Sequence, residues 1–261
     1  MNLRLILALA VVFAAGCSDS SGPATSSTPA APAATPPSAA AAETTPAATA
    51  EESAPAARAQ NAASGDATAA LAALGFENGV HYVRLSPAQP TSSSPDQVEI
   101  AEFFMYSCIH CYNFEPYVQQ WLMSKSDYVN FLRVPTVWNP TVRLHAQAFY
   151  AAEALGKGEE MHAPFFSEMH ERNNYLQSED AIAAFFSKFG VGREEFDKAF
   201  DSFSVHTKLQ RADELARRYQ VDSTPTIVVN GKYRTNASMA GGYDKLLELM
   251  NALAAAEHSM N

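Results

Sequence analysis

Two cysteines in the middle of the chain, Cys108 and Cys111, are separated by two residues and stand where the sequence pattern changes. The preceding segment, Val98–Met105, is rich in β-branched and aromatic residues, which is typical of a buried strand, and helical spacing follows it. A thiol at the start of a helix faces unpaired N–H groups and the positive end of the helix dipole, and both favour the thiolate. We therefore expect Cys108 to be exposed, acidic and reactive.

The second cysteine lies one helical turn further along. We expect Cys111 to be more buried and to act as the resolving thiol, which closes a redox-active disulfide with Cys108. His110 stands between them and can donate a hydrogen bond or place positive charge near the Cys108 thiolate. Each such interaction stabilises the reduced form and makes the disulfide a stronger oxidant.

Two other interpretations of this motif stay open. A purely structural disulfide is possible, but a bridge between Cys108 and Cys111 would close a very small loop and stabilise little by chain entropy. A metal site is also possible, because Cys108, His110 and Cys111 supply soft ligands. The sequence offers no second cysteine pair and no His-x-His cluster to complete four-coordination. Thiol redox chemistry is favoured, and neither a metal nor a dissociable cofactor is expected.

The elements that must position the cysteines follow from the hydrophobic pattern. Between residues 140 and 215, approximately, apolar residues recur with the spacing of amphipathic helices, and a final helix is predicted at Tyr243–Leu253. Asn230-Gly231 predicts a tight hairpin turn. The fold class is therefore α/β, with two halves of a small sheet separated by a helical insertion. The predicted strands are Val98–Met105, Val129–Pro135, Thr226–Val229 and, more weakly, Gly79–Leu85.

The first 66 residues differ in composition from the rest of the 261-residue chain. Residues 18–66 are mostly Ala, Pro, Ser, Thr and Gly and contain no Leu, Ile, Val, Phe or Met. Such a segment cannot bury enough apolar surface to offset the entropy of ordering it, so we expect a disordered linker over 17–66. Residues 67–261 are long enough to form one domain with a sizeable core.

The N-terminus has the pattern of an export signal. Leu5–Ala15 is apolar but too short to span a membrane, which predicts a signal peptide over 1–16. Cys17 follows small residues and resembles the lipidated cysteine of a bacterial lipobox; the alternative is a plain secretory signal with an incidental cysteine. Lipidation at Cys17 would anchor the chain to a membrane, and Ser18 in the next position favours the outer membrane.

Overall charge limits the expected partners. The formal net charge is −10 at pH 7, which makes non-specific binding to nucleic acid or to anionic lipid unfavourable. No run of 18 apolar residues is present, so no membrane-spanning helix is expected.

Two segments resemble the DsbA family of thiol:disulfide oxidoreductases. They are Glu102-Phe103-Phe104 with Cys108–Glu115, and Val221–Tyr233, and the resemblance extends over about Gly75–Leu253. It implies a thioredoxin fold with an inserted helical domain and no dissociable cofactor. The sequence departs from the family at Ile109, where DsbA proteins typically have proline. Because the residues between the cysteines tune the reduction potential, this departure leaves the oxidising strength open.

The resemblance also implies roles for individual residues. Pro225 matches a cis-proline that faces the active site. Thr224 would then offer its backbone to an extended substrate strand, and Ile109 would border the same substrate. Glu102 resembles a buried acid that shuttles protons to the resolving thiol, whereas an ordinary partly exposed glutamate at a strand edge is the alternative. Glu115 matches a family acidic position, although a surface role is equally compatible with its place in the helix.

These observations lead to a hypothesis of a lipid-anchored dithiol oxidase that faces the periplasm. Its substrates would be reduced or unfolded exported proteins, and a DsbB-like membrane protein would reoxidise it. Thr224-Pro225 is closer to the isomerase and reductase members of the superfamily, so a reductase supplied by a membrane electron donor, or an isomerase, is the alternative. A non-enzymatic thiol metal-binding module and a peptide-binding module that uses the Pro225 groove are the alternatives outside this class.

Overall fold

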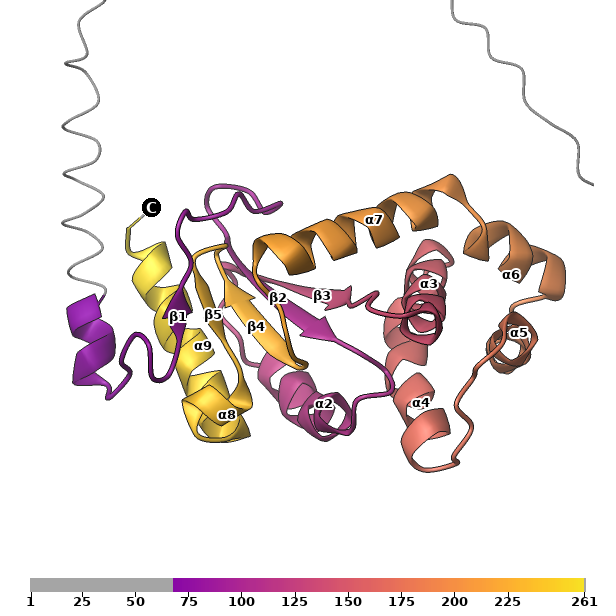
Figure 1. Cartoon of the computed structure of the whole chain (residues 1–261), viewed down its shortest axis with the longest axis horizontal. Coiled ribbons are helices and arrows are strands. Elements are labelled where there is room, and N and C mark those ends of the chain that lie inside the picture. The colour runs from indigo at the N-terminus through magenta and orange to yellow at the C-terminus, as the bar shows by residue number, and fades with distance from the viewer. Residues whose placement is uncertain (1–67, 261) are drawn as a thin grey trace, which may run out of the picture. The chain divides into compact units, whose positions relative to one another are not determined.

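The structure, a computed structural model, describes residues 68–260, and its centre is a mixed five-stranded sheet (Figure 1). The strand order is β1-β5-β4-β2-β3. The predicted signal peptide, Cys17 and the linker lie outside the described residues. The strands are β1 (Val83–Arg84), β2 (Val98–Phe104), β3 (Val129–Pro135), β4 (Thr226–Val229) and β5 (Tyr233–Thr235). The helices with labels in Figure 1 are α2 (Ile109–Leu122), α3 (Pro140–Ala154), α4 (Gly158–His170), α5 (Glu179–Ser187), α6 (Arg193–Phe200), α7 (Phe203–Arg218), α8 (Ala237–Ala240) and α9 (Tyr243–His258).

Strand β2 is the central element that leads to the cysteines. All of its residues are buried, and it pairs in parallel with β3 and antiparallel with β4. Strand β3, which precedes the helical insertion, and β4, which follows it, thus both pair with β2. This agrees with the prediction that the insertion separates two halves of one sheet. The hairpin between β4 and β5 turns at Asn230 (φ 49°) and Gly231 (φ 62°), so both residues have the positive φ that the predicted tight turn needs. A Cβ atom at Gly231 would lie 2.1 Å from the Gln89 carbonyl oxygen, so only glycine fits there.

Two predicted elements differ in length from the structure. The expected strand Gly79–Leu85 is reduced to β1, because Gly79 (φ 84°) closes a turn through its N–H to the Tyr82 carbonyl at 2.7 Å. Helix α9 continues beyond the predicted end at Leu253 to His258, because the following alanines favour helix.

Five helices, α3 to α7, lie between β3 and β4 in the chain. In Figure 1, α3 to α6 gather on one side of the sheet, and α7 leads back from them towards β4. Their aromatic residues form one hydrophobic core with Phe103, Phe104 and Cys111. A second core joins the sheet to α9 and to Phe114 and Val118 of α2. Helix α2 therefore contributes to both cores, and this packing holds its N-terminus in place.

Within residues 68–260, no helix has both the length and the apolar character needed to cross a membrane.

Candidate active site

Cys108 lies where β2 leads into α2. It is the N-cap residue of α2, with an extended backbone (φ −87°, ψ 116°), and it is half-buried. Its N–H donates to the Met105 carbonyl at 3.1 Å, which closes the turn after β2. The sulfur thus stands at the positive end of a helix that begins at the next residue, Ile109, as the sequence predicts.

Several donors favour the thiolate of Cys108. A hydrogen bond from the Cys111 thiol lowers the pKa of Cys108 to about 5 against the effect of burial, and the Thr224 side chain and the main-chain N–H groups of Cys111 and His110 act in the same direction. Both cysteines are free thiols in this structure. The acidic thiol expected at this position is therefore present.

Cys111 has the opposite surroundings. Its side chain is 1% exposed, and burial raises the pKa of its thiol well above the usual value. The hydrogen bond with Cys108 and the negative charges of Cys108 and Glu102 raise this pKa further. Cys111 is therefore more buried than Cys108, as predicted, but Cys108 is half-buried rather than exposed, because the Thr224 carbonyl and the neighbouring Cys111 thiol cover part of it.

The loop before β4 brings Pro225 to the active site from a distant part of the chain. The Thr224–Pro225 peptide bond is cis, as the resemblance implies, and the Cys108 thiol donates to the Thr224 carbonyl at 3.3 Å. A cavity of about 340 Å³ lies beside them and is lined by His110, Thr224, Pro225 and Tyr243, among other residues. The cavity is thus connected to the reactive cysteine through Thr224, which lines it and whose carbonyl contacts the Cys108 thiol.

His110 and Ile109 occupy the first turn of α2. Ile109 is 48% exposed next to Cys108, so an apolar side chain borders the reactive sulfur. The main-chain N–H of His110 is one of the groups that lower the pKa of Cys108, and the suggested role of the His110 ring stays a prediction. The His110 carbonyl accepts a hydrogen bond from the Tyr243 hydroxyl at 3.1 Å.

Glu102 is a buried acid in β2. Its side chain lies in the interior, which excludes the alternative of an exposed glutamate at a strand edge. Burial and the negative charge of Glu115 raise the pKa of Glu102 to about 8, although Arg133 opposes this shift. The Arg133 Nε atom lies 4.0 Å from Glu102 Oε2. The surroundings of Glu102 thus favour the protonated form of its carboxyl group, which lies near Cys111.

Glu115 is buried rather than exposed on the helix surface. Its carboxylate accepts hydrogen bonds from Arg133 Nη2 at 3.0 Å and Gln119 Nε2 at 2.6 Å, and it lies 3.3 Å from His162 Nε2. Burial alone would raise the pKa of Glu115, but the hydrogen bond from His162 and the charges of His162 and Arg133 lower it. The two buried carboxyl groups therefore have pKa values shifted in opposite directions.

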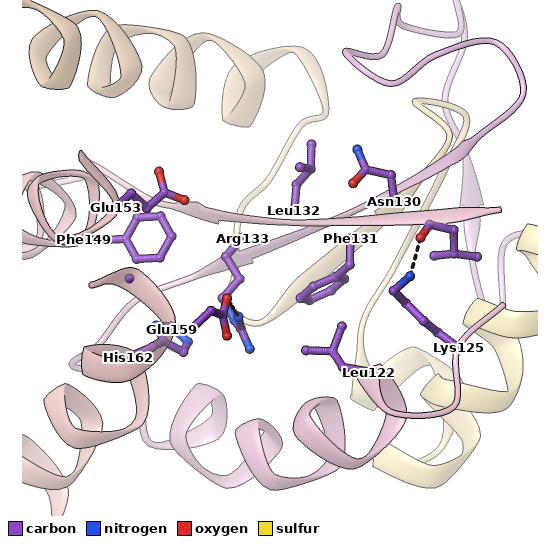
Figure 2. Close-up of a pocket in the computed structure, with 12 residues that line it drawn as sticks. Leu122, Lys125, Asn130, Phe131, Leu132, Arg133, Phe149, Glu153, Glu159 and His162 are labelled. Atoms are coloured by element: carbon purple, nitrogen blue, oxygen red, sulfur yellow. Dashed lines mark hydrogen bonds and ion pairs between the residues drawn. The ribbon is translucent and has the colours of Figure 1, made fainter. Parts of the chain in front are cut away.

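Arg133 and His162 are the residues that the sequence analysis missed. Figure 2 shows them together with Glu159 on one side of β3, beside a cavity of about 320 Å³. Arg133 lies opposite Glu102 in the register between β2 and β3. The signal available for Arg133 was a charged residue within a predicted strand, as for Glu102. His162 gives no local signal, because α4 brings it to Glu115 from the helical insertion.

Among residues 68–260, no group of three or more His, Cys, Asp or Glu side chains is arranged to hold a metal ion.

Comparison with known proteins agrees with this geometry. Residues 125–254 match the model of the DSBA-like thioredoxin domain. The thiol:disulfide interchange protein DsbA of Pseudomonas syringae pv. tomato is 36% identical over 192 residues, which cover 74% of this chain and 89% of that protein. The DsbA of Burkholderia cepacia is 34% identical over 67% of this chain and 83% of its own length.

Solved structures are similar as well. The crystal structure of Pseudomonas aeruginosa DsbA matches with a TM-score of 0.68 and 34% identity, over 72% of this chain and 97% of that one. DsbA from Xylella fastidiosa matches with a TM-score of 0.66 and 28% identity, over 70% of this chain and 98% of that one. The predicted thioredoxin fold with a helical insertion is confirmed. This chain belongs to the DsbA family and is a thiol:disulfide oxidoreductase.

Proposed function

We propose that this protein is a periplasmic dithiol oxidase that donates the Cys108–Cys111 disulfide to reduced exported proteins. The observation that carries the proposal is the contrast between the two thiols. A pKa of about 5 keeps Cys108 as a stabilised thiolate in the reduced protein, and stabilising the reduced form makes the disulfide a stronger oxidant.

The proposed reaction starts from the disulfide form. A substrate thiolate attacks the Cys108 sulfur, the Cys108–Cys111 bond breaks, and Cys111 leaves as a thiolate. Because the raised pKa of Cys111 favours the thiol, it takes a proton, and the protonated carboxyl group of Glu102 supplies one nearby. A second substrate thiolate then attacks the substrate sulfur of the mixed disulfide, and Cys108 leaves as its stable thiolate. The substrate loses two electrons, and the protein gains them as a dithiol.

The site also suits an unfolded substrate chain. Thr224 has its carbonyl next to the Cys108 sulfur, so an extended peptide that pairs with the Thr224 backbone brings its own cysteine to the reacting atom. Pro225 holds this loop in the cis form, and the exposed Ile109 side chain offers an apolar contact.

Reoxidation and location complete the proposal. A membrane protein of the DsbB type would take the two electrons from the dithiol. Lipidation at Cys17 would tether the domain at a membrane surface through the linker. An outer-membrane anchor would separate the domain from an inner-membrane reoxidant, so mapping the anchor by membrane fractionation, with Cys17→Ala as the unlipidated control, decides between the two membranes.

The reduction potential of the Cys108–Cys111 pair tests the oxidase proposal directly. Equilibration in glutathione buffers should give a value above about −150 mV; the oxidising end of the known scale, about −120 mV, is itself set by a DsbA protein. A value below about −220 mV would overturn the oxidase proposal and favour a reductase that receives electrons from the membrane. Thr224-Pro225, which is closer to the reductase and isomerase members, is the observation that favours this second candidate, and Ile109 leaves the oxidising strength open.

A further inference from the structure

Tyr243 lies against the active site although it is far from the cysteines in sequence. It is the first residue of α9, and the chain reaches it through Gly241 (φ 94°) and Gly242 (φ 127°), two conformations that favour glycine. Its ring stacks on Phe114, with centroids 5.2 Å apart and planes at 26°, and lies 5.1 Å from the ring of Tyr117. These contacts fix the Tyr243 side chain along one face of α2.

The Tyr243 hydroxyl is directed at one peptide group of the active site. It donates to the His110 carbonyl at 3.1 Å. This carbonyl belongs to the same peptide group as the N–H of Cys111, one of the main-chain groups in the first turn of α2 that lower the pKa of Cys108. The Tyr243 hydroxyl therefore binds a peptide group in the first turn of α2, the helix for which Cys108 is the N-cap residue.

A donor on the carbonyl side of a peptide group polarises it, and the N–H on the other side becomes a stronger donor. In the low dielectric of a half-buried site, such polarisation is greater than in water. The bond also restrains the plane of this peptide group, and with it the direction of the Cys111 N–H at the start of α2.

We propose that Tyr243 is a positioning residue for thiol:disulfide exchange, which acts through the His110–Cys111 peptide group to stabilise the reduced form of Cys108. The hydroxyl does not touch the reacting sulfur in this role. The pKa of Tyr243 is itself raised by burial and by the charges of Cys111 and Cys108, as expected for a neutral donor next to the thiolates. The proposal does not depend on the direction of electron flow, so it stands for an oxidase and for a reductase alike.

The test is Tyr243→Phe, which removes the hydroxyl and keeps the ring on Phe114. Two quantities are measured on the purified protein: the pH midpoint of the Cys108 thiolate, from its ultraviolet absorbance, and the equilibrium constant with glutathione. We expect a higher midpoint and a change of about threefold in the equilibrium constant towards the disulfide, which corresponds to a reduction potential about 14 mV more negative. Tyr117→Phe is the matched control, because it removes a hydroxyl from the neighbouring ring and leaves the bond to His110 in place.

The other outcomes overturn the proposal in distinct ways. An unchanged midpoint and potential in Tyr243→Phe would show that the hydrogen bond has no effect on Cys108. An equal shift in Tyr117→Phe would show that the effect comes from packing around α2. Tyr243 also lines the cavity beside Pro225, so a higher KM with unchanged potential would make it a substrate contact instead. The unfolding midpoints of the variants are compared, so that a loss of fold is not taken for a change in potential.

Discussion

The two cysteines are three positions apart in the chain, yet the structure gives them opposite surroundings. Cys108 stands at the helix end among hydrogen-bond donors, and Cys111 lies in the core near Glu102. The first environment favours the charged form of a thiol and the second favours the neutral form. In the proposed reaction, this difference assigns attack and release to Cys108 and proton uptake to Cys111.

The buried side of this comparison extends further into the protein. Behind Cys111, the carboxyl groups of Glu102 and Glu115 share Arg133, and Glu115 also contacts His162 of α4. Tyr106 adds a second link, since its hydroxyl lies 2.9 Å from His162 Nδ1. A network of buried charges thus connects β2, α2 and β3 to the helical insertion, whereas Cys108 is served by main-chain groups and its neighbouring thiol.

Replacing each cysteine by serine gives the largest expected effect. Cys108→Ser removes the sulfur that is attacked, and disulfide exchange with a reduced peptide should fall by at least about a thousandfold. Cys111→Ser keeps a hydroxyl donor beside Cys108 but removes the resolving thiol, so mixed disulfides should accumulate and be visible by mass spectrometry.

The same variants test whether the surroundings differ. The thiolate absorbance of Cys111→Ser should titrate with a midpoint near the pKa of about 5 for Cys108, and that of Cys108→Ser should titrate above the usual thiol range. Equal midpoints in the two variants would show that the contrast between the cysteines does not exist in solution.

Arg133→Met gives the next largest effect and concerns stability. It leaves Glu102 and Glu115 buried without their shared cation, so the free energy of unfolding should fall by about 3–5 kcal/mol at pH 7. The loss should be smaller in acid, where Glu115, whose pKa is lowered, also becomes protonated. Arg143→Met, at an exposed position, is the control and should change stability by less than about 0.5 kcal/mol. If denaturant titrations gave the same loss in free energy of unfolding for both variants, Arg133 would not stabilise the buried carboxyl groups of Glu102 and Glu115.

The sequence pattern was sufficient to predict those elements of the fold that depend only on residues close together in the chain. A few neighbouring residues determine each of three features: the buried strand β2, the start of α2 directly after Cys108, and the turn at Asn230-Gly231. The structure contains all three. The cis bond at Pro225 was expected only because of the family resemblance.

What the sequence did not show depends on contacts between distant segments. Glu115 looks like a surface residue of α2 until β3 and α4 supply Arg133 and His162, and neither partner is near it in the chain. In the sequence, Tyr243 cannot be distinguished from other aromatic residues at helical spacing. Its place next to the active site follows from the packing of α9 on α2. Periodicity predicts which face of a helix is buried, but it does not say which side chain that face will meet.

The pH dependence of stability should differ between the reduced and oxidised proteins. A thiol whose pKa falls to about 5 on folding binds fewer protons in the folded state than in the unfolded state, so the reduced protein gains stability as the pH rises from about 5 towards the usual thiol pKa. This gain is lost as the pH falls through about 5, and the disulfide form lacks the titration. Glu102 changes stability in the opposite direction. Because its pKa is raised from 4.5 to about 8 on folding, the folded state binds more protons than the unfolded state, and both redox forms lose stability as the pH rises from about 4.5 to 8.

Denaturant unfolding at a series of pH values measures both effects. The stability difference between the reduced and oxidised proteins should increase with pH, with a slope that approaches one proton, and Cys108→Ser should remove the increase. Glu102→Gln should remove the decrease that the oxidised protein shows, whereas Glu248→Gln, on the exposed side of α9, should not. A decrease that persists in Glu102→Gln would mean that another buried group titrates in this range.

The smallest expected effect is that of Ile109→Pro. Ile109 is the first residue of α2, a position that suits proline, and the extended backbone of Cys108 suits a residue that precedes proline. The groups that lower the pKa of Cys108 are the Cys111 thiol, the Thr224 side chain and the main-chain N–H groups of Cys111 and His110, so the loss of the Ile109 N–H removes none of them. Stability should therefore change by no more than about 1 kcal/mol, and the thiolate midpoint should stay close to that of Ile109→Ala, which controls for the lost side chain. A large shift specific to the proline variant would show that the Ile109 backbone contributes to the thiolate, and the comparison between the two cysteines would then need a further donor on the Cys108 side.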